Sequence, residues 1–289
     1  MAVIGIDLGT TNSLAGVWQD GKVVLIPNAF GEYLTPSVVS IGKNQEVFVG
    51  SVAKEMLATQ PYDTFREFKR NMGTNFLYGN GRKKYRAEEL SAFVLRRLKE
   101  DAEKFLGEEV TEAVISVPAY FDDNKRNATK NAGRLAGLKV ERLINEPSAV
   151  ALKHHTAEKG AESFIVFDFG GGTLDVSLVE AFDNVVEIQA VAGDNYLGGK
   201  DFNEIIAQDF YEQNQISEAY LTKNEQENVL KEAEAVKKEL TDKNEAERQV
   251  YIKGEAYTLK MTNQRLIHLS AELFSRMAKP IAKVINMVG

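Results

Sequence analysis

The sequence predicts a duplicated α/β fold, in which two lobes built on one plan face each other across a cleft. The first observation is a strand–turn–strand pattern that occurs at residues 4–17 and again at 165–178. In both copies an apolar strand ends in an aspartate, Asp7 or Asp168, and a turn of small residues leads into a second apolar run. The second observation is that strands alternate with helices after the first copy, which is typical of α/β domains.

Each copy continues into a third strand. The turn sequence Asp20-Gly21 precedes an apolar run at 22–26, and Asp183-Asn184 precedes another at 185–191. Short turns of Asp, Asn and Gly between alternating apolar runs are the usual mark of a β-hairpin. Each lobe is therefore expected to open with a three-stranded antiparallel meander.

After its meander, the first half reads as a helix-rich insertion followed by strand, helix, strand and helix. Pro118 ends the first of these strands, and Asp122 or Asp123 can cap the helix that follows. Strand–helix–strand order implies parallel pairing within an α/β sheet. The expected elements are a helix at 88–106, a strand at 114–117, a helix from about 122 to 135, a strand at 140–144 and a helix opening at 145–147.

The second half begins to repeat this plan. Thr262 or Asn263 is expected to cap a last helix, which corresponds in position to the helix at 88–106. No counterpart of the strand at 114–117 or of the elements after it is found, so we expect the chain to end within its second lobe. The expected elements are helices at 201–213 and 223–241, strands near 249–252 and 256–261, and a helix through about 288.

These elements suggest a division of the chain into two lobes, each with an insertion subdomain. Lobe I is expected to span residues 1–160, with a core of 1–35 and 111–160 and an insertion subdomain of 36–110. Lobe II is expected to span 161–289, with a core of 161–200 and 278–289 and an insertion subdomain of 201–277.

Composition limits the classes of function. The net charge of −7 argues against a sequence-independent nucleic-acid binder, which needs a basic surface. The chain has no cysteine, which excludes disulfides, thiolate catalysis and cysteine-ligated metals. We expect no membrane partner, because no apolar stretch approaches the roughly 18 residues that span a bilayer. The N-terminus has no basic region before its apolar run, so it does not read as a signal peptide, and the cytoplasm is the expected location.

The glycine turn at 170–172 lies between two aspartates, Asp168 and Asp175. Consecutive backbone N–H groups in a tight turn can hold phosphate, and glycine lets the backbone approach closely. The chain contains no P-loop motif, and its glycine turn opens a strand rather than the helix that a Rossmann fingerprint requires. One such turn alone would be an ordinary hairpin. Two matched turns predict a clamp that holds a triphosphate from both sides, with Asp7 and Asp168 holding Mg²⁺ through waters.

Five segments together resemble the nucleotide-binding domain of DnaK-type heat-shock chaperones of seventy kilodaltons. They keep the family's order and approximate spacing, and the resemblance covers essentially the whole chain. The segments are GIDLGTTNS at 5–13, VISVPAYF at 114–121, INEPS at 144–148, FDFGGGTLDVS at 167–177 and LGGKDF at 197–202. The hairpin AGVWQDG at 15–21 and the segment FGEYLTP at 30–36 look closest to the HscC-like subgroup.

The resemblance implies a ribonuclease-H-like fold, as in actin, sugar kinases and heat-shock ATPases, with two lobes around a nucleotide cleft. It implies ATP or ADP, Mg²⁺ and K⁺ as ligands. Metal-shell residues would be Asp7, Asp168 and Asp175. Catalytic residues would be Lys69, Glu146, Asp168 and Thr173. Nucleotide-binding residues would be Gly9, Thr10, Thr11, Asn12, Gly170, Gly171, Gly172, Thr173, Gly198, Gly199, Glu234, Lys237, Lys238 and Thr241.

Several of these residues have simpler interpretations when taken alone. Lys69 can be a solvated helix lysine, and Glu146 can be a first-turn carboxylate favoured by the helix dipole. The residues near 234–241 can equally form a charged helix face in water. Pro118 and Arg142 match a family relay that reports nucleotide state, but a strand-ending proline and a surface arginine are the favoured interpretation of this pair.

The resemblance implies a slow ATPase whose nucleotide state controls a C-terminal peptide-binding domain, in protein folding and the stress response. Its expected partners are ATP, a J-domain co-chaperone, a nucleotide-exchange factor and the protein's own peptide-binding domain. Two alternatives share the fold. A small-molecule kinase would need an acceptor pocket with its own catalytic aspartate, and an actin-like filament protein would sediment in a nucleotide-dependent way.

Overall fold

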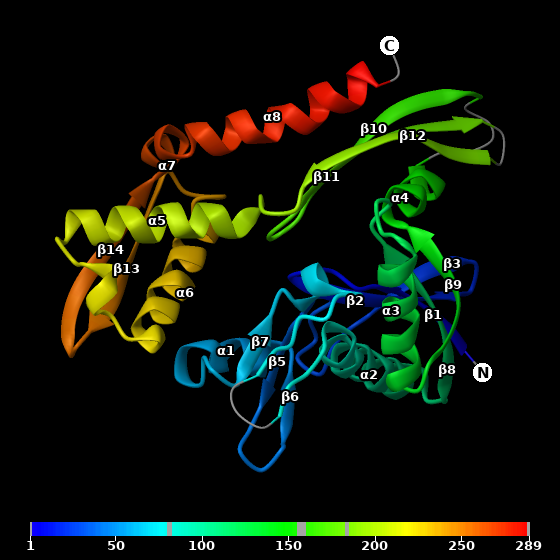
Figure 1. Ribbon diagram of the computed structural model, residues 1–289, viewed down its shortest axis with the longest axis horizontal. Helices are drawn as coiled ribbons and strands as arrows, with labels where there is room; N and C mark the ends of the chain where they lie inside the picture. Colours follow the sequence, from blue (N-terminus) through cyan, green and yellow to red (C-terminus); the bar gives the residue numbers. More distant parts are fainter. Residues whose placement is uncertain (1, 80–82, 155–159, 183–184, 288–289) are drawn as a thin grey trace.

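The computed structural model describes residues 2–79, 83–154, 160–182 and 185–287. It is a mixed α/β structure in which lobe I and lobe II lie side by side (Figure 1). The N-terminal meander belongs to the sheet of one lobe and the second meander to the sheet of the other. This arrangement is the duplicated α/β fold that the two matching strand–turn–strand patterns predict.

The main sheet of lobe I contains the first meander and two parallel strands, in the order β3-β2-β1-β8-β9. The pairs β1–β2 and β2–β3 are antiparallel, whereas β1–β8 and β8–β9 are parallel, as the strand–helix–strand order predicts. A short strand, β4 (Thr35–Pro36), pairs with the start of β2. The five long strands are β1 (Ala2–Asp7), β2 (Asn12–Gln19), β3 (Lys22–Ile26), β8 (Val110–Val117) and β9 (Lys139–Asn145).

The insertion of lobe I contains the expected helix near 88–106 and a second helix, but the part before residue 87 also contains strands that were not predicted. It contains a three-stranded antiparallel sheet in the order β6-β5-β7, covered by one short helix. Strands of three or four residues are too short to show a clear period of two, which explains why the pattern was missed. The elements are β5 (Val38–Ile41), β6 (Val47–Val49), α1 (Ser51–Thr59), β7 (Thr64–Arg66) and the 3-10 turn η1 (Phe68–Asn71).

Three helices complete lobe I, and local capping explains where they begin. Glu89 accepts a hydrogen bond from the Arg86 N–H at the start of α2, at 2.7 Å. Asp122 rather than Asp123 caps α3 and accepts from the Lys125 N–H at 2.9 Å. The helices are α2 (Ala87–Leu106), α3 (Asp123–Leu135) and α4 (Glu146–His154).

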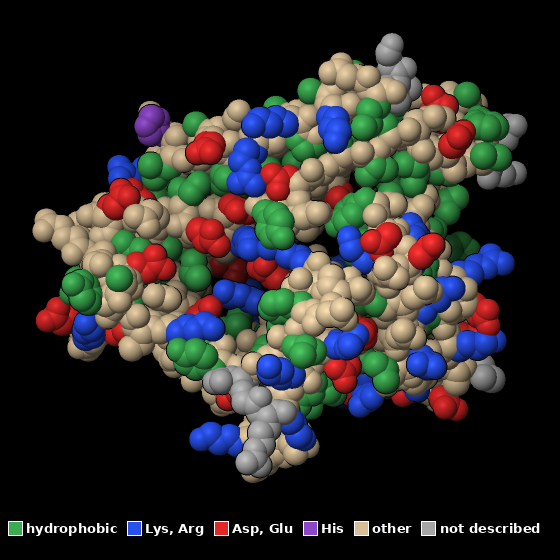
Figure 2. Space-filling view, viewed as in Figure 1, with side chains coloured by type: hydrophobic (Ala, Val, Ile, Leu, Met, Phe, Trp, Pro, Cys, Tyr) green, Lys and Arg blue, Asp and Glu red, His purple; other side chains and the backbone are tan. Residues whose placement is uncertain are grey.

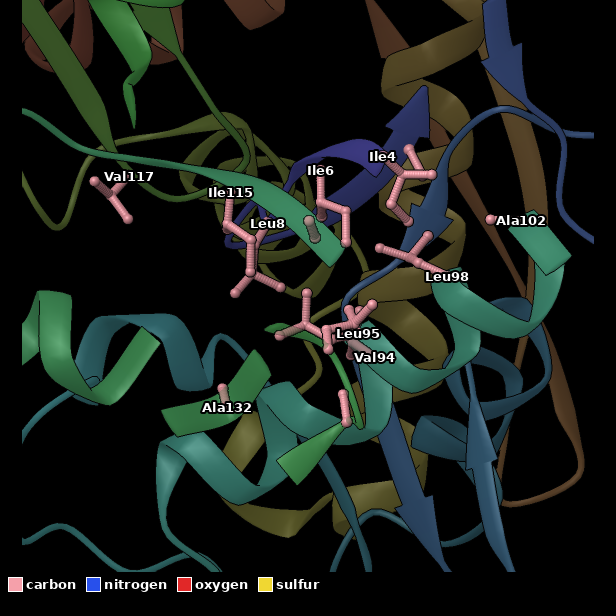
Figure 3. Packing of buried hydrophobic residues seen from close by; sticks show 14 of the residues in the cluster. Ile4, Ile6, Leu8, Val94, Leu95, Leu98, Ala102, Ile115, Val117 and Ala132 are labelled. Carbon is pink, nitrogen blue, oxygen red and sulfur yellow. The ribbon is translucent and has the colours of Figure 1, made fainter. Parts of the chain in front are cut away.

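The core of lobe I lies between the main sheet and these helices (Figure 3). Ile6 and Ile115 project from neighbouring parallel strands, and Leu95 of α2 packs beneath them (Figure 3). All three side chains are buried, and each contributes about 1.5–3 kcal/mol through burial of apolar surface. This packing fixes the carboxyl ends of β1 and β8, where Asp7 lies opposite Ser116 in the strand register.

The second meander consists of β10 (Glu162–Phe169), β11 (Leu174–Phe182) and β12 (Val185–Asp194). Both strand pairs are antiparallel, and the predicted turn at Asp183-Asn184 lies outside the described residues. The register differs from that of the first meander in one important position. Asp168 lies opposite Asp175, whereas Asp7 lies opposite Leu14. The second turn therefore presents two carboxylates where the first presents one.

The insertion of lobe II packs two helices against a β-hairpin. The helices are α5 (Gly199–Gln213) and α6 (Lys223–Glu239), and the strands are β13 (Glu245–Ile252) and β14 (Glu255–Thr262). A 3-10 turn, η3 (Glu218–Tyr220), lies between the helices. Phe210, Val229 and Leu259 form part of its separate apolar core. The helix expected at 223–241 ends at Glu239, so Thr241 lies beyond it.

The single helix expected from about residue 263 to 288 is two helices, so this prediction was wrong. Thr262 caps α7 (Asn263–Leu269), and α8 (Ala271–Asn286) follows after Ser270. Helical spacing of apolar residues continues across the break, which leaves no periodic signal of it. Leu273 of α8 packs with Leu174 and Leu197 against the second meander. None of the helices in the described part of the chain is long and apolar enough to cross a membrane.

Candidate nucleotide site

Two cavities meet where the lobes face each other. The smaller has a volume of about 230 Å³ and the larger about 400 Å³. Thr10, Thr11, Asn12 and Gly171 line both cavities, so the two turns form the wall that they share. Basic and acidic side chains gather along the groove between the lobes (Figure 2). This placement brings the two turns together, as their duplicated sequence pattern predicts.

The first turn is held rigidly by the segment that follows the meander. The Ser37 N–H donates to the Thr11 carbonyl at 2.8 Å, and the Ser37 hydroxyl donates to the Gly9 carbonyl at 2.8 Å. A Cβ atom added at Gly9 would lie 2.0 Å from the Asn12 carbonyl oxygen, so only glycine fits this bend. The turn therefore presents its two threonines in a fixed position.

The second turn packs against the start of α5. The Gly199 N–H donates to the Gly170 carbonyl at 3.0 Å, and the Lys200 N–H donates to the Gly171 carbonyl at 2.8 Å. A Cβ atom added at Gly198 would lie 2.3 Å from the Gly172 nitrogen, which explains the small residue there. Gly198 and Gly199 thus support the turn from behind.

Only one of the three glycine N–H groups in this turn already donates a hydrogen bond within the described residues. Gly170 already donates its N–H to the Thr173 carbonyl at 2.9 Å, within the hairpin. No hydrogen bond between described residues uses the N–H groups of Gly171 and Gly172. Of the three glycine amides expected to bind phosphate, two are therefore available.

Four carboxylates gather in the smaller cavity: Asp7, Glu146, Asp168 and Asp175. Asp7 accepts a hydrogen bond from the Ser116 hydroxyl at 2.8 Å. Desolvation, together with the negative charges of Glu146 and Asp168, raises the pKa of Asp175 to about 7. Desolvation also raises the pKa of Glu146 and of Asp168, and the charge of Asp7 adds to both effects. Solvent still reaches Asp7 and Asp168 within the cleft.

A hydrated Mg²⁺ ion fits this cluster. The Asp175 Oδ1 atom is buried and has no hydrogen-bond partner, so the site leaves one carboxylate oxygen unsatisfied. A cation would also relieve the repulsion between the four carboxylates. Among the residues that the structure describes, no three carboxylate or histidine side chains are placed to ligate one metal directly. Asp7, Asp168 and Asp175 could hold the ion through its water molecules.

Lys69 lies at the base of the same cavity. Its side chain is buried, and Nζ lies 2.8 Å from Glu146 Oε1. The η1 turn carries it, and Phe68 of that turn is fixed in the core of lobe I. The alternative interpretation of Lys69 as a solvated lysine is therefore wrong. Glu146 is likewise more than a first-turn carboxylate, because it forms this buried ion pair.

Arg70, which the sequence-based interpretation did not include, links the two lobes at the glycine turn. Its Nη2 donates to the Gly172 carbonyl, and its Nη1 lies 2.9 Å from Glu67 Oε2. The guanidinium also lies over the ring of Tyr196, 5.5 Å from its centroid. Gly172 leaves the space that Arg70 fills, because an added Cβ would lie 2.2 Å from Nη2. Its position next to Lys69 was the only signal available in the sequence.

A second missed arginine contacts the strand end at Pro118. Arg126 of α3 donates from Nε to the Phe121 carbonyl and from Nη2 to Asn145 Oδ1, both at 2.8 Å. Arg142, which was matched to the family relay, has an exposed side chain on β9. Arg126 is therefore the arginine that contacts the segment after Pro118 and the residue before Glu146.

Only some of the residues expected near the adenosine line the larger cavity. Glu234 and Lys237 of α6 line it, whereas Lys238 and Thr241 do not. Burial alone would raise the pKa of Glu234, but hydrogen bonds from Lys238 and Lys54 and their charges lower it to about 2. Desolvation lowers the pKa of Lys237 to about 8. Its Nζ donates to the Gly199 carbonyl, so this lysine has a structural partner.

Ion pairs between the lobes close the groove beside this cavity. Lys54 Nζ lies 2.7 Å from Glu234 Oε2, and Arg66 Nη1 lies 2.8 Å from Glu227 Oε2. A further pair joins Lys200 to Glu67 at 3.0 Å, and both of these residues also line the larger cavity. Each pair has one partner in lobe I and one in lobe II. Charge thus contributes to the contact between the lobes.

The combination of two matched meanders, facing turns and a carboxylate cluster is that of an actin-like ATPase fold. A family model described as Hsp70 protein matches residues 3–80 and 77–288. The matched stretches cover nearly the whole chain, so the chain belongs to the Hsp70 family and is an Hsp70-type nucleotide-binding domain. Membership of the family implies a chaperone ATPase domain that binds nucleotide with Mg²⁺. The family match does not distinguish the subgroups of the Hsp70 family, so the assignment to the HscC-like subgroup stays a prediction.

Proposed function

We propose that this chain binds ATP with Mg²⁺ between its two turns and hydrolyses it slowly. One observation carries the proposal: the two turns line one cavity together with four carboxylates and a buried lysine. The hydroxyls of Thr10 and Thr11 and the free amides of Gly171 and Gly172 would bind the phosphate chain. Asp7, Asp168 and Asp175 would orient the water shell of Mg²⁺. The ion, when bound, neutralises charge on the phosphates.

Hydrolysis at this site would depend on positioning and charge stabilisation, as phosphoryl transfer generally does. Lys69 would contact the γ-phosphate and stabilise the charge that develops there. Glu146, paired with Lys69, would hold the attacking water in line with the bond that breaks. Thr173 would lie beside the γ-phosphate, and Glu234 and Lys237 would border the adenosine.

In this proposal the ATPase cycle controls a peptide-binding domain of the full-length protein. The two ion-paired lobes, 1–160 and 161–289, would change their relative position as ATP becomes ADP. A J-domain co-chaperone and a nucleotide-exchange factor would act on that cycle, K⁺ would bind near Asp175, and the protein would work in the cytoplasm. These roles extend those of the family to this chain.

Isothermal titration of Mg-ADP tests the metal site. The change Asp168→Asn removes one negative charge and keeps the shape of the side chain. We expect it to weaken Mg-ADP binding about tenfold, the low end of effects on groups that orient metal ligands. ADP without Mg²⁺ should bind the Asp168→Asn protein at least as tightly as the unchanged protein, because one repelling charge is removed.

Asp242→Asn is the matched control, because Asp242 is an exposed aspartate beyond the end of α6. It should bind Mg-ADP as the unchanged protein does. Equal affinity of the Asp168→Asn protein would show that the metal site lies elsewhere. Absence of ADP formation from Mg-ATP by the unchanged chain would refute the proposed hydrolysis.

A further inference from the structure

The smaller cavity contains a third cation that the proposed hydrolysis does not use. Lys69, Arg70 and Lys125 all line this cavity. Lys125 lies in the first turn of α3, just after the segment that follows Pro118. Its side chain is only partly buried, whereas that of Lys69 is almost completely buried. The three cations therefore extend from the base of the cavity toward its opening.

The ring of Phe121 connects the buried lysine to the outer one. Lys69 Nζ lies 5.8 Å from the centroid of this ring, and Lys125 Nζ lies 5.5 Å from the same centroid. Lys125 Nζ also lies 5.5 Å from the centroid of Tyr120. Attraction of a cation to an aromatic face holds each lysine in place without neutralising its charge. An anion that leaves Lys69 would thus meet a second fixed positive charge one ring away.

Only Lys125 keeps its charge free for such an anion. Lys69 is paired with Glu146, and Arg70 is paired with Glu67 and donates to the Gly172 carbonyl. Lys125 forms no ion pair with any carboxylate in the described part of the chain. The Asp122 carboxylate, which lies near it in sequence, accepts from its backbone N–H. Lys125 therefore offers an anion a positive charge that no carboxylate of the described residues pairs with.

Two tyrosines that line the smaller cavity are accessible to solvent. Tyr120 is 36% exposed and Tyr196 is 70% exposed, in contrast to 7% for Lys69. Desolvation and the charges of Asp175 and Glu146 raise the pKa of Tyr120, so its hydroxyl stays protonated and can donate a hydrogen bond. The adenosine side lies in the other cavity, beyond the two turns. A ligand could therefore leave the smaller cavity without passing the nucleoside.

We propose that Lys125, with the Tyr120 hydroxyl, forms a binding site for inorganic phosphate on its way out of the smaller cavity. The cleaved phosphate moves from Lys69 past Phe121 to Lys125 while ADP is still bound between the turns. Lys125 thereby sets how strongly phosphate and ADP are held together. This inference rests on the proposed function, because it assigns phosphate to the product of that reaction.

The test adds ADP, Mg²⁺ and inorganic phosphate directly, so it does not require hydrolysis. The measured quantity is the dissociation rate of a fluorescent ADP analogue at rising phosphate concentration. Phosphate should slow ADP release from the unchanged protein. In Lys125→Gln the phosphate concentration for half of this effect should rise about fivefold, equivalent to about 1 kcal/mol. Lys125→Arg should restore the original value to within about twofold, because it keeps the charge.

Lys130→Gln is the control, since Lys130 is an exposed lysine of the same helix. It should respond to phosphate as the unchanged protein does. An unaltered phosphate response of Lys125→Gln, or no effect of phosphate on ADP release from the unchanged protein, would overturn the proposal. Loss of ATP hydrolysis with an intact phosphate response would instead refute only the proposed function.

A second measurement decides the question if Lys125→Gln does not fold or ADP does not bind. The lysines of the unchanged protein are dimethylated with a ¹³C label, and their NMR signals are followed during addition of inorganic phosphate. The signal that is missing in Lys125→Arg belongs to Lys125. We expect this signal to shift at lower phosphate concentration than that of Lys130. Equal responses of the two lysines would overturn the proposal.

Discussion

Asp175 is a partly buried carboxylate whose ionisation affects the stability of the folded protein. It is inward-facing, one of its oxygens lacks a partner, and its pKa is raised to about 7. The ordinary pKa of an unfolded aspartate is about 4. Between these two values the folded protein binds a proton that the unfolded chain has released. Asp175 therefore favours the folded state at low pH and opposes it once ionised.

The first prediction follows from this loss of stability as Asp175 ionises. The melting temperature of the metal-free protein should fall as pH rises from about 5 to about 8, through the raised pKa. In Asp175→Asn, which cannot ionise, this fall should be smaller, by roughly 2–4 °C for each kcal/mol removed. Differential scanning calorimetry at several pH values measures both slopes. Asp242→Asn serves as control and should keep the original slope, while equal slopes for Asp175→Asn would contradict the prediction.

For single residues, the sequence showed which side chains belong to the site but not which residues they contact. Asp7, Asp168 and Asp175 could be assigned from the motifs around them, because strand ends and tight turns leave few places for a carboxylate to point. The burial of Lys69 could not, since it depends on the packing of η1 against the core of lobe I and on an ion pair with Glu146, 77 residues away in sequence. The same applies to Arg70, whose contact with Gly172 spans 102 residues.

Among the elements, the β10–β11 hairpin turn is the most tightly constrained. A Cβ atom added at Gly171 would lie 2.1 Å from Thr11 Oγ1 in the opposite turn. The φ angle of Gly171 is not in the left-handed region, so an alanine there meets a steric rather than a conformational obstacle. The glycine thus sets how closely the two turns approach.

The second prediction concerns this distance. Gly171→Ala should push the turns apart and weaken Mg-ADP binding about tenfold, equivalent to about 1.4 kcal/mol. Gly5→Ala is the matched control, because its Cβ would meet nothing closer than the Gly16 carbonyl oxygen at 3.9 Å. Titration calorimetry compares the two proteins. Unchanged affinity in Gly171→Ala would mean that the phosphates do not lie between the turns.

Elements with strong local signals could be predicted, and those fixed by packing could not. The helix α2 has a clear apolar stripe and a capping pattern, and its predicted start lay one residue from the observed one. The strands of the insertion are too short to carry a pattern, and their pairing joins residues that are distant in sequence. The break at Ser270 is set by α8 packing on the second meander, which no local spacing reports.

In the whole molecule, ion pairs join the insertions of the two lobes, and α4 also packs against the second meander. Lys54–Glu234 and Arg66–Glu227 join α1 and β7 to α6, and both pairs are partly accessible to solvent. Partly exposed pairs contribute modestly and are weakened by salt. The contact between α6 and the insertion of lobe I therefore depends in part on ionic strength, while each lobe has its own apolar core.

The third prediction is that salt speeds ADP release through these pairs. Raising NaCl from about 0.05 M to about 0.5 M should increase the dissociation rate of a fluorescent ADP analogue about two- to fivefold. The double change Lys54→Gln with Arg66→Gln should release ADP faster at low salt and respond less to added salt. Lys243→Gln removes a pair within lobe II and should behave as the unchanged protein. The same salt response in all three proteins would exclude a role for the pairs.

The register difference between the two meanders has a consequence for the direction in which a ligand binds. Two identical halves would have twofold symmetry and would present the same groups to both ends of a bound chain. Here one half places a leucine where the other places Asp175, so the pseudo-symmetry is broken at the site itself. A triphosphate has one end attached to a nucleoside and one end free. A site without symmetry can tell these ends apart and can act on only one of them.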